Sequence, residues 1–160
     1  MPSAARPVGG RQLAVGSGQT EESSGPERGV SVKLPDDIAS SEGKEIIVPV
    51  SVEGTANKGI ISYEFDLRYD PAVIQPLVDS ADLKGTVSRG LSAVVNATEP
   101  GLLRVVVYGA MPIDKDGVLL NLRFAAVGNS GSVSPLLFER IMFNEGGPRV
   151  NVADGRIELF

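Results

Sequence analysis

The chain has 160 residues, of which 42% are hydrophobic and 22% are charged, and its formal net charge is −5 at pH 7. It contains no cysteine and no histidine, which excludes thiol nucleophiles, imidazole bases and the usual zinc ligands, and with them Ser-His-Asp and Cys-His catalysis. Because the chain is acidic and its Lys and Arg residues are scattered singly, we expect neither nucleic acid nor an anionic membrane as a partner.

The first 28 residues differ in composition from the rest of the chain. They are rich in Gly, Ser, Pro, Glu and Gln, and such a segment buries too little apolar surface to offset an ordering entropy of about 1–2 kcal/mol per residue. We predict a flexible linker or disordered tail over 1–28 and one domain over 29–160. The alternative at this end is an extra edge strand at RQLAV, residues 11–15.

Two kinds of targeting segment are not expected. The N-terminal residues show no apolar h-region of a signal peptide. No apolar run approaches the roughly 18 residues that would predict a membrane span.

From residue 30 onward, alternating apolar residues separated by Gly, Pro and Asp turns predict short β-strands. The expected strands cover residues 30–34, 46–52, 59–69, 73–78, 91–98, 102–110, 118–127, 133–143 and 149–160. Residues 79–90 are the least regular part and are predicted to form a loop with a short helical turn. Strands of this length and spacing are typical of an antiparallel β-sandwich.

A proline interrupts the first long apolar strand, IIVPVSV at 46–52. Its apolar residues share one face, whereas Pro49 lies on the other. Because proline has no N–H to give to a ladder, this strand is predicted to lie at an edge or to contain a bulge.

The segment GIISYEFDLRYDP, 59–71, shows the clearest alternation. One parity is apolar and comprises Ile61, Tyr63, Phe65, Leu67 and Tyr69. The other is polar and comprises Ser62, Glu64, Asp66 and Arg68. We expect the apolar parity to pack between two sheets and the polar parity to remain outside.

The polar parity also contains the one carboxylate pair that suggests an enzyme. Glu64 and Asp66 lie two residues apart on one face, and two carboxylates could serve glycoside hydrolysis. The alternative is an exposed polar face on which Arg68 balances part of the charge. We favour the alternative, because a half-buried strand is expected to have such a face.

Three short motifs carry less weight. The segment DKDG, 114–117, begins like a calcium loop but lacks the remaining ligands, so a tight turn is predicted. The segment NAT, 96–98, matches the glycosylation acceptor pattern but falls in an expected strand, and we assign it no role. A GxG at 16–18 lies in the predicted linker and does not follow a strand, which argues against a nucleotide loop.

The order of the segments resembles the bacterial cohesin domain, the cohesin of cellulosomes. The motifs that carry the resemblance are Val48-Pro49-Val50, Tyr69-Asp70-Pro71 with Val73, Lys115-Asp116-Gly117-Val118, Arg123-Phe124 and the strand from Gly155 to Leu159. No single motif is specific, but the ordered set covers most of residues 30–160.

This resemblance implies a nine-stranded jelly-roll sandwich that binds protein without catalysis or a cofactor. Cohesins hold calcium-loaded dockerin domains against a sheet face that includes the strand ending in Tyr-Asp-Pro. Cellulosomal members carry an Asn and an Asp on the polar face of that strand, at the positions of Ser62 and Glu64 here. Glu retains the charge on a longer arm, whereas Ser lacks an amide that both donates and accepts hydrogen bonds.

We therefore predict a non-enzymatic recognition module of an extracellular or cell-surface protein, with a dockerin-like or other protein partner and no metal site. The predicted partner-binding residues are Ser62, Glu64, Asp66, Arg68, Arg104 and Asn121. The last two come from strands expected to share the sheet of the first four.

Two further functions stay open. A carbohydrate-binding module on a similar jelly roll would need exposed aromatic residues, and the chain has no Trp and only 5% aromatics. A structural module that assembles larger chains would need no separate ligand.

Overall fold

The computed structural model describes residues 11–13 and 29–160. In these ranges the chain forms strands, turns and loops, and no helix that could cross a membrane. The strands are β2 (Arg11–Leu13), β3 (Val30–Lys33), β4 (Ile38–Ser40), β5 (Glu45–Glu53), β6 (Ile60–Arg68), β7 (Ile74–Asp82), β8 (Ser92–Asn96), β9 (Leu102–Ile113), β10 (Gly117–Ala126), β11 (Val133–Phe143), β12 (Val150–Ala153) and β13 (Gly155–Leu159).

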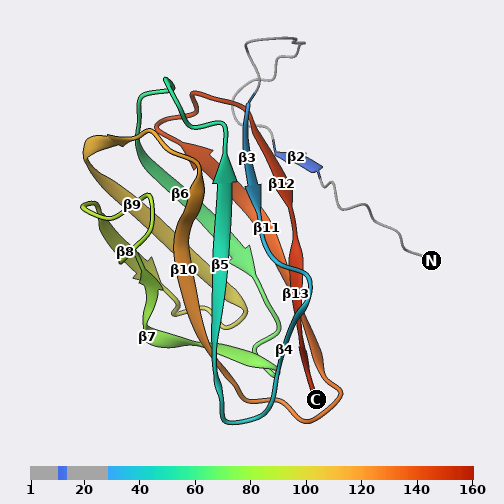
Figure 1. The fold of residues 1–160 in the computed structure, drawn as a ribbon. Helices are drawn as coiled ribbons and strands as arrows, with labels where there is room; N and C mark the ends of the chain where they lie inside the picture. The colour runs from blue at the N-terminus through green and yellow to red at the C-terminus, as the bar shows by residue number, and fades with distance from the viewer. Residues whose placement is uncertain (1–10, 14–28) are drawn as a thin grey trace.

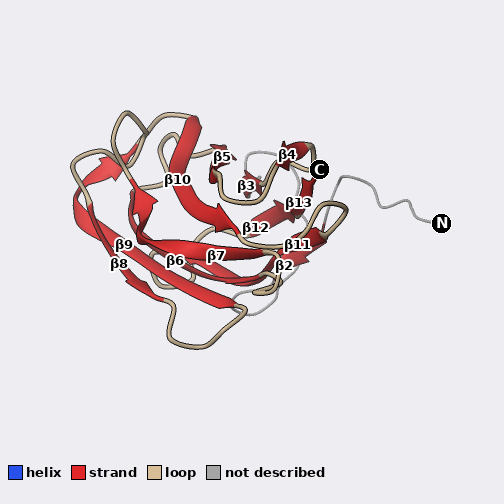
Figure 2. Cartoon of the chain, turned by 90° about the horizontal axis from the view of Figure 1, so that it is seen from below, coloured by secondary structure: helices blue, strands red, loops and turns tan. Residues whose placement is uncertain are grey.

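The strands form two six-stranded sheets that pack face to face (Figure 1). One sheet has the order β2-β12-β3-β5-β10-β7, and the other has the order β4-β13-β11-β6-β9-β8. The view in Figure 2 shows strands and loops throughout the described residues. The predicted all-β two-layer sandwich is therefore confirmed.

The predicted linker is only partly within the described residues. Residues 11–13 pair antiparallel with β12, with Gln12 opposite Asn151. They fall within residues 11–15, for which an extra edge strand was the alternative prediction. Residues 1–10 and 14–28 lie outside the described residues, so the linker and the domain boundary at residue 29 stay predictions.

The first and last parts of the domain run side by side and change sheets together. β3 pairs parallel with β12 in one sheet, and β4 pairs parallel with β13 in the other. The expected strand at 149–160 is thus two strands, and the expected antiparallel sandwich contains two parallel pairings. The short strand β4 was missed because three residues are too few to show a period of two.

The sequence placed two other features imprecisely. Residues 79–90 were expected to be a loop with a helical turn, whereas β7 extends to Asp82 and turns follow it. Strand β5 lies inside its sheet and not at an edge, yet β3 pairs only with residues 51–53 of it. Pro49 therefore has a strand neighbour on one side only, opposite Asn121, and its missing N–H costs no ladder bond on the other side.

The inner faces of both sheets make one apolar core. Strand β6 contributes Tyr63, Phe65 and Leu67, all essentially inaccessible to solvent. The rings of Phe65 and Phe138 meet edge-on with centroids 5.4 Å apart, and Tyr69 crosses to Phe124 of the opposite sheet at 5.7 Å. Each such buried side chain contributes about 1.5–3 kcal/mol relative to exposure.

One residue of the apolar parity of 59–71 lies on the outer face and not in the core. Ile61 was expected in the core, but it is exposed and Ile60 is buried instead. The register between β6 and β9 shifts between Ile60 and Ser62, and such a bulge inserts one residue and reverses the parity beyond it.

Gly155 stands where the terminal strands change sheets. A Cβ at this position would lie 2.1 Å from the carbonyl oxygen of Pro35, and the N–H of Arg156 donates to that same oxygen at 3.1 Å. The close approach of the two backbones therefore requires glycine, which explains the glycine that begins the last motif.

We expect Gly155→Ala to lower the free energy of unfolding by about 1–3 kcal/mol, because the added methyl must push the two backbones apart. Urea unfolding followed by circular dichroism measures this change. Gly147→Ala is the matched control, since a Cβ there meets nothing within 4 Å. Equal losses for the two variants would contradict the crowding at Gly155.

Candidate functional site

The outer face of β6 is the centre of the candidate site. Strand β6 lies between β9 and β11 and pairs antiparallel with both. Its alternation sends Ser62, Glu64, Asp66 and Arg68 away from the core, as the sequence predicts. Because β6 has a paired strand on each side, these side chains lie in the middle of a broad face.

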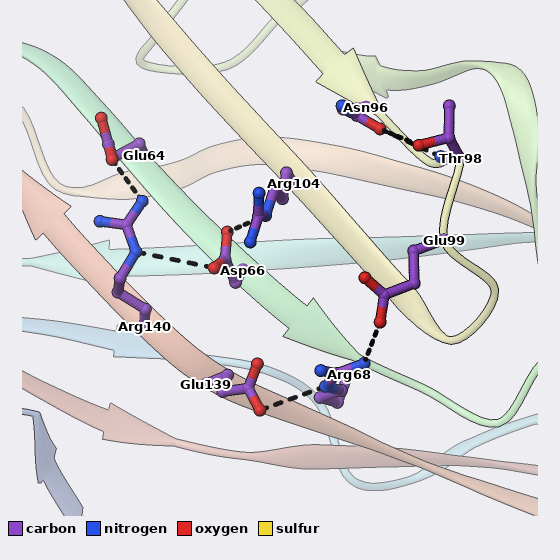
Figure 3. Close-up of polar contacts among 9 residues, drawn as sticks. All are labelled: Glu64, Asp66, Arg68, Asn96, Thr98, Glu99, Arg104, Glu139 and Arg140. Atoms are coloured by element: carbon purple, nitrogen blue, oxygen red, sulfur yellow. Dashed lines mark hydrogen bonds and ion pairs between the residues drawn. The ribbon is translucent and has the colours of Figure 1, made fainter.

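Asp66 is the best-shielded polar residue of this face, with only 7% of its surface exposed. It is held from both sides. Its Oδ1 lies 3.4 Å from Nε of Arg104 on β9, and its Oδ2 lies 3.6 Å from Nε of Arg140 on β11 (Figure 3). The two guanidinium groups cover the carboxylate, so Asp66 orients its neighbours instead of facing solvent.

Arg140 extends this network to Glu64. Its Nη2 donates to Glu64 Oε2, and this hydrogen bond is the main reason that the pKa of Arg140 is raised above its ordinary value. Glu64, Arg140, Asp66 and Arg104 thus form one continuous ion-pair row across β11, β6 and β9 (Figure 3).

A second ion-pair cluster surrounds Arg68 at the end of β6. Its Nε donates to Glu139 Oε2 at 3.2 Å, and its Nη1 lies 3.5 Å from Glu99 Oε2. Both carboxylates are at least half exposed. Exposed ion pairs are weak and exchange readily with water, so these two pairs hold Arg68 only weakly.

An apolar group lies beside the ion-pair row. Val94 of β8 is opposite Val106 of β9, which in turn is opposite Glu64 of β6. Tyr108 lies two residues further along β9, opposite Ser62, and is 49% exposed. We call Val94, Val106 and Tyr108 the apolar cluster. The face therefore combines exposed apolar area with fixed charges.

Five of the six predicted residues share this face. Arg104 is on β9 beside Asp66, as expected of a strand in the same sheet. Asn121 is not on the face: it belongs to β10 in the opposite sheet, between Pro49 and Asp82. The expectation that its strand shares the sheet was wrong, because the parity of a strand does not say in which sheet the strand lies.

Sequence reasoning missed several residues of the face. Arg140 and Glu139 lie on β11, where a register shift between Phe138 and Arg140 sets which residues point out. Val106 and Tyr108 lie in a nearly all-apolar run, in which the period of two is invisible. The one available signal was Arg104: a charged residue is expected to point outward, and Val106 and Tyr108 have the same parity on β9 as Arg104.

The hydrolase alternative finds no support in the geometry. Glu64 and Asp66 both pair with Arg140 on an open sheet face. A pocket of about 270 Å³ lies elsewhere, and no acidic side chain lines it. The lining residues are Tyr69, Pro71, Gln75, Pro76, Ala97 and Pro100.

The aspartates of DKDG hold a loop. Asp116 Oδ1 accepts hydrogen bonds from the N–H groups of Gly54 at 2.9 Å and Thr55 at 3.2 Å, and Asp114 Oδ1 accepts one from Asn57 at 3.3 Å. Within 11–13 and 29–160, no group of three or more acidic side chains is placed to hold a metal ion.

Few aromatic rings reach the surface. Tyr63 is buried, donates or accepts a hydrogen bond with Ser88 at 2.8 Å, and has its pKa raised by that burial. In the described residues, the exposed aromatic side chains are Tyr108 and Phe160. They do not form the flat aromatic platform that sugar recognition needs.

The comparison with family models identifies one family. A family model described as Cohesin domain matches residues 30–155. A comparison with curated protein sequences finds no match.

Solved structures show the same fold. The sixth cohesin of scaffoldin B from Acetivibrio cellulolyticus, in complex with a mutant Cel5 dockerin, is 22% identical with a TM-score of 0.69, and the alignment covers 82% of this chain and 99% of that one. The OlpA cohesin of a type I complex with the dockerin Doc918 from Clostridium thermocellum is 20% identical, also with a TM-score of 0.69, over 83% and 100% of the two chains.

We expect Asp66→Asn to lower the free energy of unfolding by about 1–3 kcal/mol, because an amide keeps the shape but presents N–H groups to a guanidinium that has lost its carboxylate. Glu139→Gln, a matched change at an exposed position of the same face, should stay within about 0.5 kcal/mol of the parent. Denaturant unfolding measures both. A larger loss for Glu139→Gln would show that Asp66 is not the fixed point of the row.

Proposed function

The chain belongs to the cohesin family, whose members are non-catalytic protein-binding modules, and from this premise we propose that it captures a dockerin-like protein domain. The partner docks on the outer face of β8, β9, β6 and β11, which we call the docking face. The observation that carries the proposal is the fixed row of ion pairs beside the apolar cluster on this one face.

The size of the docking face fits a specific interface. Four strands about 4.8 Å apart, with an average length of about nine residues, span roughly 19 by 30 Å. This is the scale of the ~800 Å² that each partner contributes to an interface of standard size. A single strand could not supply such an area.

The composition of the docking face also resembles that of protein–protein interfaces. Interfaces bury apolar and aromatic side chains at the centre, with Arg enriched and polar groups at the rim. Here Val106 and Tyr108 lie next to β6, while Glu99 and Glu139 lie at its end. Because the guanidinium groups are already oriented by carboxylates, a partner that meets them loses little further side-chain entropy.

The two solved relatives support the partner class. Each of those cohesins was crystallised with a dockerin. We propose the same class of partner for this chain, with Ser62 and Glu64 in place of the Asn and Asp of cellulosomal members as the determinants that select among dockerins.

An extracellular or cell-surface location follows from the same proposal. A module without catalysis acts by joining other domains, and the Gly- and Ser-rich composition of residues 1–28 suits a tether between such domains. We propose that the module belongs to a larger secreted or surface protein.

We expect the double variant Glu64→Ala/Arg68→Ala to bind a dockerin at least about tenfold more weakly than the parent, or ~1.4 kcal/mol. The thermal midpoint should stay nearly unchanged because both side chains are partly exposed. Biolayer interferometry against a panel of calcium-loaded dockerin domains measures the affinity. Asn121→Ala, on the opposite sheet, is the matched control and should bind like the parent.

Two results would count against the proposal. Parent-like affinity of the double variant would show that another surface binds the partner. Failure of every dockerin in the panel to bind the parent, at concentrations that saturate a known cohesin, would overturn the partner class.

A further inference from the structure

The tripeptide Asn96-Ala97-Thr98 lies at the exposed end of β8, where the chain leaves the sheet. It is the single Asn-x-Ser/Thr pattern of the sequence. In the sequence the pattern alone carried no weight, because three residues match often by chance. The structure adds the conformation of the turn and the state of each polar atom.

The side chain of Asn96 folds back onto Thr98. Asn96 Oδ1 accepts the backbone N–H of Thr98 at 3.0 Å and the Thr98 hydroxyl at 2.9 Å (Figure 3). Within the described residues, the hydrogen bonds of the Asn96 side chain are these two, both at Oδ1. Its Nδ2 points away from Thr98 (Figure 3). The amide therefore has its oxygen doubly engaged and its nitrogen open to solvent.

This arrangement suits reaction at nitrogen. An amide nitrogen is a poor nucleophile because its lone pair is delocalised onto the oxygen. Two donors on Oδ1 stabilise negative charge there, which makes the N–H protons easier to remove. The threonine that the pattern requires is the residue that supplies both donors.

We propose that Asn96 is the acceptor of an asparagine-linked glycan. In the reaction, Nδ2 attacks the anomeric carbon of a sugar held as a diphosphate ester by a glycosyltransferase. The new bond is carbon to nitrogen, the anomeric carbon–oxygen bond breaks, the diphosphate leaves with its electron pair, and the Nδ2 proton passes to a base of the transferase.

The position of Asn96 in the fold gives the glycan a physical role. Among the described strands, β8 is the outermost one of its sheet, so one side of its backbone pairs with no other described strand. Such an edge is prone to pair with another chain, and Val94 beside it is 54% exposed. A hydrated glycan at the end of β8 would keep other strands from this edge.

The glycan would lie at the rim of the docking face and not on its centre. Asn96 is opposite Arg104, which is opposite Asp66, so two strand spacings, about 10 Å, separate Asn96 from Asp66. The glycan would therefore border the docking face, and its proposal does not depend on partner capture.

The test uses the full chain. The parent is secreted from yeast behind a cleavable leader, and the folded chain is also incubated in vitro with a single-subunit oligosaccharyltransferase and its lipid-linked donor. Intact-mass spectrometry before and after peptide-N-glycosidase reads the result. We expect one oligosaccharide on the parent and on Thr98→Ser, and none on Asn96→Gln or Thr98→Ala.

A matched variant distinguishes the effect of the Asn-x-Thr pattern on glycosylation from the effect of the turn conformation. Asn96→Gln/Arg123→Thr moves the pattern to Asn121-Leu122-residue 123 within β10, where Asn121 lies in the ladder between Pro49 and Asp82. Its folded form should stay unmodified in vitro, with folding checked by circular dichroism. A parent that stays unmodified in vitro, or a transplanted pattern modified as fully as Asn96, would overturn the proposal.

Discussion

The apolar layer between the two sheets is the constraint on which the rest of the structure depends. Phe65 and Leu67 of β6 are fully buried in it, and the ring of Tyr69 packs against Phe124 of the facing sheet at 5.7 Å. Because side chains alternate along a strand, burial of these residues forces Glu64 and Asp66 to the other side. A slip of one residue would reverse every side chain of β6, so the core and the docking face specify each other.

The proposed docking face is built on the same strands that seal the core. Asp66 lies between a guanidinium from each neighbouring strand, and the shielding of this carboxylate sets the directions of Arg104 and Arg140. A surface whose charges are fixed before binding loses little entropy when a partner arrives. The apolar cluster adds area that favours burial. In the proposed complex, the weakly paired Arg68 at the end of β6 would exchange its carboxylates for those of the partner.

The edge strands of the two sheets end in different ways. On one sheet, residues 11–13 pair with β12, and the terminal strands of the domain cross between sheets at Gly155, where backbone meets backbone. On the other sheet, β8 ends in the turn at Asn96. Exposed strand edges are where sandwiches tend to associate, which gives a physical reason to place a bulky hydrophilic group at that turn.

The sequence by itself determined the class of fold and the outward parity of β6. Its alternating strands and turn residues predicted a two-layer β-sandwich, and Ser62, Glu64, Asp66 and Arg68 were assigned to the face on which they lie, because period-two patterning depends only on residues close in the chain.

Only the tertiary structure decided which strands share a sheet and which residues from elsewhere complete the face. It put Asn121 in the opposite sheet, brought Arg140 to Asp66 and exposed Ile61 through a bulge. The physical reason is that sheet order, register and bulges are set by pairing between segments far apart in sequence, and no local pattern records which segment will be the neighbour.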